Sequence, residues 1–102
     1  MAPSVASREV QVKYVVLYEA VDDPAVLSII PEHFPAHHEW YQGFHGRGEL
    51  LMIGPFSDRR DGAMAIFATR EAAERFVAGD PFVRAGIVRR WHIREWNEAL
   101  VD

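Results

Sequence analysis

A chain of 102 residues with 49% hydrophobic and 25% charged residues has the size and composition of one folded domain, which argues against disorder. Its net charge of −4 argues against a nucleic-acid partner, because binding to phosphates requires a concentrated basic face. The absence of cysteine excludes disulfides, thiolate metal sites and a cysteine nucleophile. No apolar run approaches the ~18–20 residues that span a membrane, so we expect no membrane partner and a cytoplasmic location.

The chain begins with small and polar residues, and we expect a flexible N-terminal tail at 1–9 followed by a single domain at 10–102. Residues 10–19 carry Tyr14, Val16 and Tyr18 at alternating positions, and this period of two predicts a strand with these side chains on one face. The acidic residues and the proline at 22–24 predict that a capped helical turn follows the strand.

The next segment contains two prolines, and they set the expected start of the main helix. A proline disfavours helical backbone angles in the residue before it, so Phe34 is expected outside the helix and the helix at 35–44. His33 then lies outside the helix as well and does not pair with His37 at helical spacing. Because no third ligand stands at a recognisable spacing, we expect no metal and no other cofactor.

The remaining elements follow from apolar periodicity and from glycine or proline breaks: a strand at 49–56, a polar hairpin loop at 57–62, a strand at 63–68, a helix at 69–79 capped by Thr69, a turn opened by Asp80, and a strand at 87–96. The order strand, helix, strand, strand, helix, strand predicts an α+β ferredoxin-like fold, with a four-stranded antiparallel sheet and two helices on one face. The other face would expose apolar side chains, so we expect a second copy of the chain to cover it in a homodimer.

Several short segments resemble the YciI-like (YCII-related) family of the dimeric α+β barrel superfamily. They are Pro35-Ala36-His37, residues 48–55, Asp61-Gly62, residues 71–73, residues 80–86 and residues 93–96. The resemblance covers roughly residues 11–97, and the Asp-Pro-Phe-x-x-x-Gly element at 80–86 is its most specific part. It implies a dimer of four-stranded sheets with a cleft between sheet and helices in each subunit. A histidine and an aspartate act in that cleft, and position by position they fall on His37 and Asp80.

The best characterised relatives act on small oxygenated ring compounds, by dehydrochlorination or isomerisation. The resemblance therefore implies a cofactor-free lyase or isomerase acting on a small polar or cyclic organic compound, with His37 as the base and Asp80 as its orienting partner. The alternative is a non-catalytic dimeric module that binds a small ligand, or serves as an accessory subunit, through the same cleft. A structural dimer with a filled cleft is a third interpretation.

Further candidates for substrate binding are less specific. Arg84 or Arg59 would hold a substrate's anion, His38 stands next to the family histidine, and the bare backbone of Gly54 would admit a ligand. Structural interpretations stand beside the catalytic ones: Asp80 precedes a proline and has the pattern of a helix N-cap, and His37 would be a solvated residue of the first helical turn.

Overall fold

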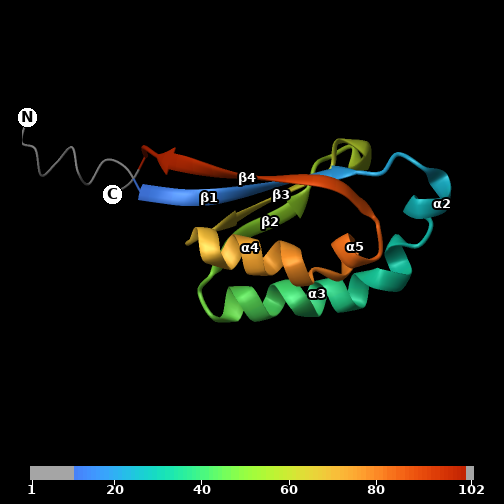
Figure 1. The fold of residues 1–102 in the computed structure, drawn as a ribbon, viewed down its shortest axis with the longest axis horizontal. Helices are drawn as coiled ribbons and strands as arrows, with labels where there is room; N and C mark the ends of the chain where they lie inside the picture. Colours follow the sequence, from blue (N-terminus) through green and yellow to red (C-terminus); the bar gives the residue numbers. More distant parts are fainter. Residues whose placement is uncertain (1–10, 101–102) are drawn as a thin grey trace, which may run out of the picture.

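The fold consists of one four-stranded antiparallel sheet with two long helices on one of its faces (Figure 1). The computed structural model describes residues 11–100, so the tail expected at 1–9 lies outside the described residues. The elements are β1 (Gln11–Ala20), α2 (Pro24–Leu27), α3 (Ile30–Gly46), β2 (Leu50–Pro55), the 3-10 helix η1 (Arg59–Asp61), β3 (Ala63–Phe67), α4 (Arg70–Gly79), α5 (Pro81–Arg84) and β4 (Val88–Glu98). The strand order β2-β3-β1-β4 confirms the expected ferredoxin-like α+β class.

The core lies between the sheet and the helices α3 and α4. Phe44 of α3, Phe67 of β3 and Phe76 of α4 are all buried, and the rings of Phe44 and Phe76 meet edge to face at 5.3 Å. Burying one such side chain stabilises the fold by about 1.5–3 kcal/mol. The expected cap of the second helix is confirmed, because the side chain of Thr69 accepts a hydrogen bond from the backbone N–H of Ala72. This cap fixes the residue at which α4 begins, and one apolar face of α4 packs into the core.

Helix α3 begins earlier than the sequence predicted. It starts at Ile30 and contains Pro35, so the prediction that Phe34 lies outside the helix is wrong. Pro31 stands in the first helical turn, where a backbone N–H has no partner within the helix. Pro35 lies inside the helix and removes the hydrogen bond to the carbonyl of Pro31. The earlier start places Ile30 and Phe34 along the wall of a cavity.

The earlier start also places His33 inside the helix, four residues before His37, contrary to the expectation from sequence. Within residues 11–100, no group of three or more His, Asp or Glu side chains lies close enough to hold a metal ion. None of the described helices is both long enough and apolar enough to cross a membrane.

The hairpin between β2 and β3 lies close against the end of β1. Residues that were expected to form a polar loop instead form η1, with the side chain of Asp58 capping its start. Gly62 ends η1 with a φ of 89°, and a Cβ atom added there would lie 1.8 Å from the carbonyl oxygen of Tyr18. Only a glycine combines that backbone angle with that close approach.

The helix-free face of the sheet carries a group of apolar side chains, with the polar Lys13, His92 and Arg94 beside them in the strand register. Because Val16 and Tyr18 point into the core, their neighbours Val15 and Leu17 point to the opposite face. The strand register adds Met64, Ile66 and Trp96 to the same face, the last from β4. We call these five residues the helix-free patch.

Replacing Gly62 by alanine is expected to destabilise the protein by about 2 kcal/mol or more, because strain at a glycine-only φ adds to a backbone clash. The free energy of unfolding, measured in urea, reports the change. Gly46→Ala is the matched control, since no atom lies within 4 Å of the added Cβ and its φ is not positive. Equal stabilities of the two variants would contradict the tight approach of η1 to β1.

Candidate active site

Asp80 lies where α4 ends and α5 begins, and its side chain is completely buried, with 0% exposure. Its Oδ1 atom accepts a hydrogen bond from the backbone N–H of Phe82 at 3.0 Å, and Pro81 occupies the first helical position. This is the N-cap that the sequence predicted. The cap fixes both the position and the direction of the carboxylate.

Two side chains from other elements also reach this carboxylate. Nδ1 of His37, on α3, lies 2.7 Å from Oδ1 of Asp80, and the hydroxyl of Tyr18, on β1, donates to Oδ2 at 2.6 Å. An ionised carboxylate only accepts hydrogen bonds, so the arrangement assigns the ring proton of His37 to Nδ1. The other ring nitrogen, Nε2, is then the acceptor that stays available to a ligand.

The imidazole of His37 is held by aromatic neighbours as well as by the carboxylate. It stacks on Phe82 with a centroid distance of 3.8 Å and an angle of 5° between the rings, and Tyr41 meets it edge-on at 5.3 Å. Nε2 has no hydrogen-bond partner in the described part of the chain. Every side-chain nitrogen or oxygen there that is fully buried does have a partner, so Nε2 is not fully buried. Nε2 is therefore accessible although His37 is only 8% exposed.

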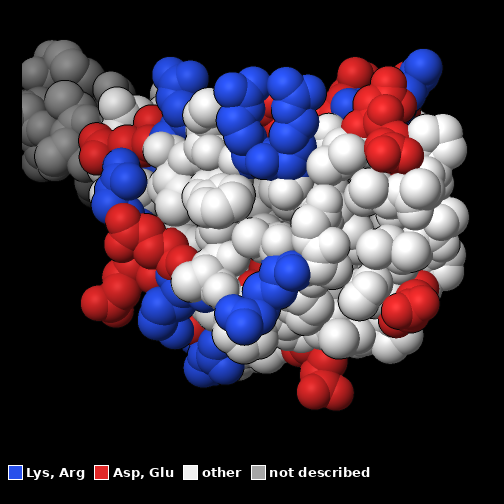
Figure 2. Space-filling model, turned by 45° about the vertical axis from the view of Figure 1, so that its right-hand side comes forward, with Lys and Arg blue, Asp and Glu red and all other residues white. Residues whose placement is uncertain are grey.

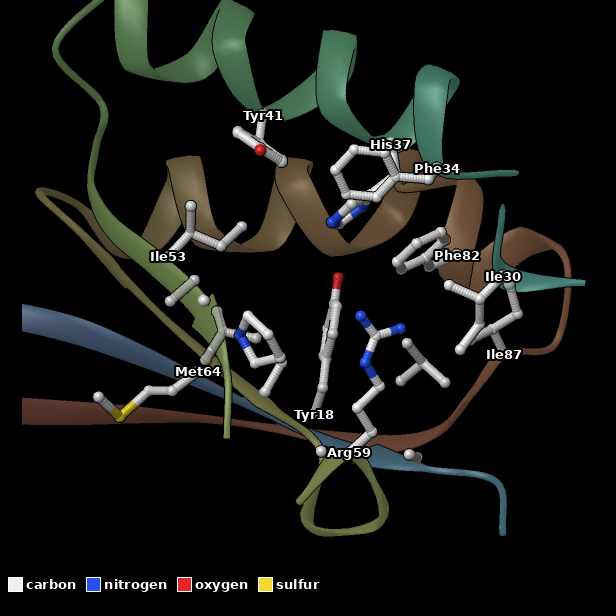
Figure 3. A pocket seen from close by; sticks show the side chains of 18 of the residues that line it. Tyr18, Ile30, Phe34, His37, Tyr41, Ile53, Arg59, Met64, Phe82 and Ile87 are labelled. Atoms are coloured by element: carbon white, nitrogen blue, oxygen red, sulfur yellow. The ribbon is translucent and has the colours of Figure 1, made fainter. Parts of the chain in front are cut away.

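A cavity of about 290 Å³ lies between the sheet, α3 and the β2–β3 hairpin, and His37 forms part of its wall (Figure 3). Figure 3 shows the hydroxyl of Tyr18 rising from the sheet toward His37. Most of the other lining residues are apolar: Val16, Ile30, Phe34, Ile53, Phe82, Ile87 and Val88 are among them. The end of the molecule that carries α2 and α5, turned forward in Figure 2, shows a broad uncharged area with charged side chains mainly along its borders.

The structure separates the substrate-binding candidates of the sequence into two groups. Gly54, at the end of β2, and Arg59, on η1, line the same cavity as His37. His38 and Arg84 are both exposed and are not part of the cavity wall. Of the two neighbouring histidines, His37 is the one that faces the cavity.

Sequence reasoning missed Tyr18 and the aromatic residues around His37. Tyr18 was assigned only to one face of its strand, together with Tyr14 and Val16, and no motif marks its contact with a residue 62 positions away. Phe34 and Tyr41 stand three residues before and four residues after His37, which places all three on one side of a continuous helix. The predicted helix at 35–44 already placed Tyr41 one turn after His37, whereas the late start assigned to that helix concealed Phe34.

Tyr18 is held in its protonated form by its surroundings. Burial raises the pKa of its hydroxyl far above the ordinary value, and the charge of Asp80 and the hydrogen bond to it act in the same direction. The hydroxyl therefore remains a donor to Asp80 at neutral pH.

Tyr18→Phe is expected to lower the free energy of unfolding at pH 8 by about 1–3 kcal/mol, because a buried carboxylate oxygen loses its donor. Tyrosine in the unfolded chain ionises near pH 10, whereas folded Tyr18 stays protonated to higher pH. The contribution of Tyr18 is thus complete below about pH 10 and declines above it, so the difference between wild type and variant should narrow between about pH 10 and 11. Urea unfolding of both proteins at each pH measures this difference in the free energy of unfolding.

Tyr14→Phe is the control for that comparison, because the hydroxyl of Tyr14 makes no hydrogen bond to any residue in the described range. The free energy of unfolding of Tyr14→Phe should vary with pH in the same way as that of the wild type. A Tyr18→Phe variant whose stability deficit stays constant through this range would refute the coupling of Tyr18 to Asp80.

The chain is similar to proteins of known structure and to one family model. TftG, the 5-chloro-2-hydroxyhydroquinone dehydrochlorinase of Burkholderia phenoliruptrix AC1100, solved in complex with 2,5-dihydroxybenzoquinone, is similar in structure with a TM-score of 0.65 and 19% identity, over 82% of this chain and 92% of that chain. A hypothetical protein of Arabidopsis thaliana aligns with a TM-score of 0.45 and 13% identity, over 90% and 91% of the two chains. No curated protein sequence matches the chain. The family model of the YCII-related domain matches residues 12–97, and the chain therefore belongs to the YCII-related family.

Proposed function

We propose that this protein is a cofactor-free lyase or isomerase that uses His37 as a general base on a small polar or cyclic organic compound. One observation carries the proposal: Nδ1 of His37 is anchored to a fully buried Asp80, while Nε2 is accessible in the wall of a cavity. A base needs one reachable lone pair and a fixed ring, and both conditions are met here.

In the proposed chemistry, Nε2 removes a proton from a carbon next to a carbonyl or next to a carbon bearing a leaving group. The released electron pair moves onto the carbonyl oxygen in the first case and expels the leaving group in the second. Asp80, 2.7 Å from Nδ1, stabilises the imidazolium that forms. In an isomerisation the imidazolium returns the proton to a different carbon, so that no external co-reactant is required.

The relative TftG supports this class of reaction by its name, which describes the loss of chlorine and hydrogen from a ring compound. At 19% identity the likeness establishes the fold, and the reaction class enters here as part of the proposal. A non-catalytic ligand-binding module would use the same cavity without needing an oriented imidazole. The fixed tautomer and the buried carboxylate behind it favour the enzyme over the module.

Proton abstraction is tested by hydrogen–deuterium exchange at carbon, followed by NMR in D₂O with a panel of ring lactones, cyclic diketones and chlorinated hydroquinones. His37→Asn is expected to reduce exchange or turnover by about 100-fold or more, the usual contribution of a general base. Asp80→Asn should also slow the reaction, because it no longer fixes the ring proton on Nδ1.

His38→Asn is the matched control for this series, since His38 is the adjacent histidine and lies outside the cavity wall. It should retain wild-type exchange. Binding of panel compounds without exchange or turnover by the wild type would favour the non-catalytic module, and equal effects of the two histidine variants would contradict the role of His37.

We also propose that the helix-free patch pairs with a second copy of the chain in a homodimer. Leaving its apolar side chains in water is unfavourable, and Trp96 and Met64 are 44% and 38% exposed. The sheet faces of two copies would cover each other around a twofold axis.

Trp96→Glu is expected to convert a dimer into a monomer, because it places a charge within the proposed interface. Trp91 has the same 44% exposure but lies on the helix-side face of β4, so Trp91→Glu is the control that should remain dimeric. Size-exclusion chromatography with light scattering measures the mass. A monomeric wild type would refute the proposed dimer.

A further inference from the structure

Arg59 is the charged side chain that reaches the cavity from the sheet side. It lies on η1, at the tip of the β2–β3 hairpin, and lines the cavity together with His37 and Tyr18. Figure 3 shows its side chain running beside the Tyr18 ring, with the guanidinium directed into the cavity. No other Lys, Arg, Asp or Glu side chain of the described range is part of the cavity wall.

Arg59 forms no salt bridge within 4.0 Å in the described part of the protein. The neighbouring Arg60 binds Asp58 through its side chain and its backbone N–H, and these contacts hold the pKa of the Asp58 carboxyl at about 2. Arg59 makes no ion pair within residues 11–100. The guanidinium of Arg59 is therefore available to form an ion pair with an anion that enters the cavity.

The rest of the cavity indicates the shape of the ligand. Its volume of about 290 Å³ is at the small end of the range for ligand sites. Aromatic rings of Phe34, Tyr41, Phe82 and His37 stand along the α3 and α5 side, and flat faces of this kind pack well against another ring. A single planar ring fits this combination of size and walls.

We propose that Arg59 makes the cavity selective for a small planar ring compound that carries a carboxylate. The guanidinium binds the carboxylate through paired N–H donors, and the ring lies between the aromatic wall and the sheet. This inference rests on the proposed function for its choice of cavity and names the substrate class of that site. It places the anionic end of the ligand at η1 and leaves Nε2 of His37 to the reacting end.

The test compares the binding of benzoate with that of benzamide, a neutral compound of nearly the same shape, by NMR titration of the full chain. Wild type is expected to bind benzoate about ten-fold more tightly, the ratio that one charge-assisted contact supplies. Arg59→Gln should abolish this preference, mainly by lowering the affinity for benzoate. Arg84→Gln is the matched control, because it removes an exposed arginine that is not part of the cavity wall, and it should keep the preference.

Equal affinity of the wild type for the two compounds, or no benzoate binding up to about 10 mM, would overturn the proposal. A preference that survives Arg59→Gln would overturn it as well. Binding does not depend on turnover, so the binding comparison and the exchange assay can fail independently of each other. A wild type that prefers benzoate but catalyses no exchange on the panel would refute the enzyme proposal and leave the role of Arg59 standing.

Discussion

The buried carboxylate of Asp80 is the constraint on which the rest of this structure depends. An ionised carboxylate removed from water is strongly destabilising unless donors replace the lost hydration. Here the donors come from three elements: the backbone of Phe82 on α5, the hydroxyl of Tyr18 on β1 and Nδ1 of His37 on α3. Satisfying one charge thus holds α5 against both the sheet and α3, and it fixes the imidazole at the same time. Stability and site geometry have a common origin.

The cavity exists because the sheet beneath the helices is built from small residues at this end. Ala63 and Ala65 of β3 contribute little volume, whereas Phe44 and Phe67 fill the core nearer the other end of α3 and β3. Close packing is therefore interrupted beside His37 and complete around Phe44. The space is a consequence of where the small residues lie along the strands.

Local signals in the sequence were sufficient for the fold, because strand alternation and helix caps involve residues only a few positions apart. The caps at Thr69 and Asp80 and the order of the strands belong to this class. The start of α3 does not belong to this class of local signals. The rule for residues before proline is also local, but Phe34 gains contacts with His37 and Phe82 that only the folded chain provides. Tertiary packing outweighed the local preference.

The candidate site was predictable only as far as the family resemblance reached. The resemblance pointed to His37 and Asp80, which the structure places in contact, but neither to Tyr18 nor to a choice between the two candidate arginines. Arg59 and Arg84 both follow turn-forming residues, and nothing in their spacing separates them. The separation arises because Gly62 lets the β2–β3 hairpin lie against the backbone of Tyr18, which brings η1 to the cavity. This hairpin takes no part in the hydrogen bonds around Asp80. In the proposed site, residues on η1 would therefore change which ligand is bound while the buried network that orients the imidazole stays the same.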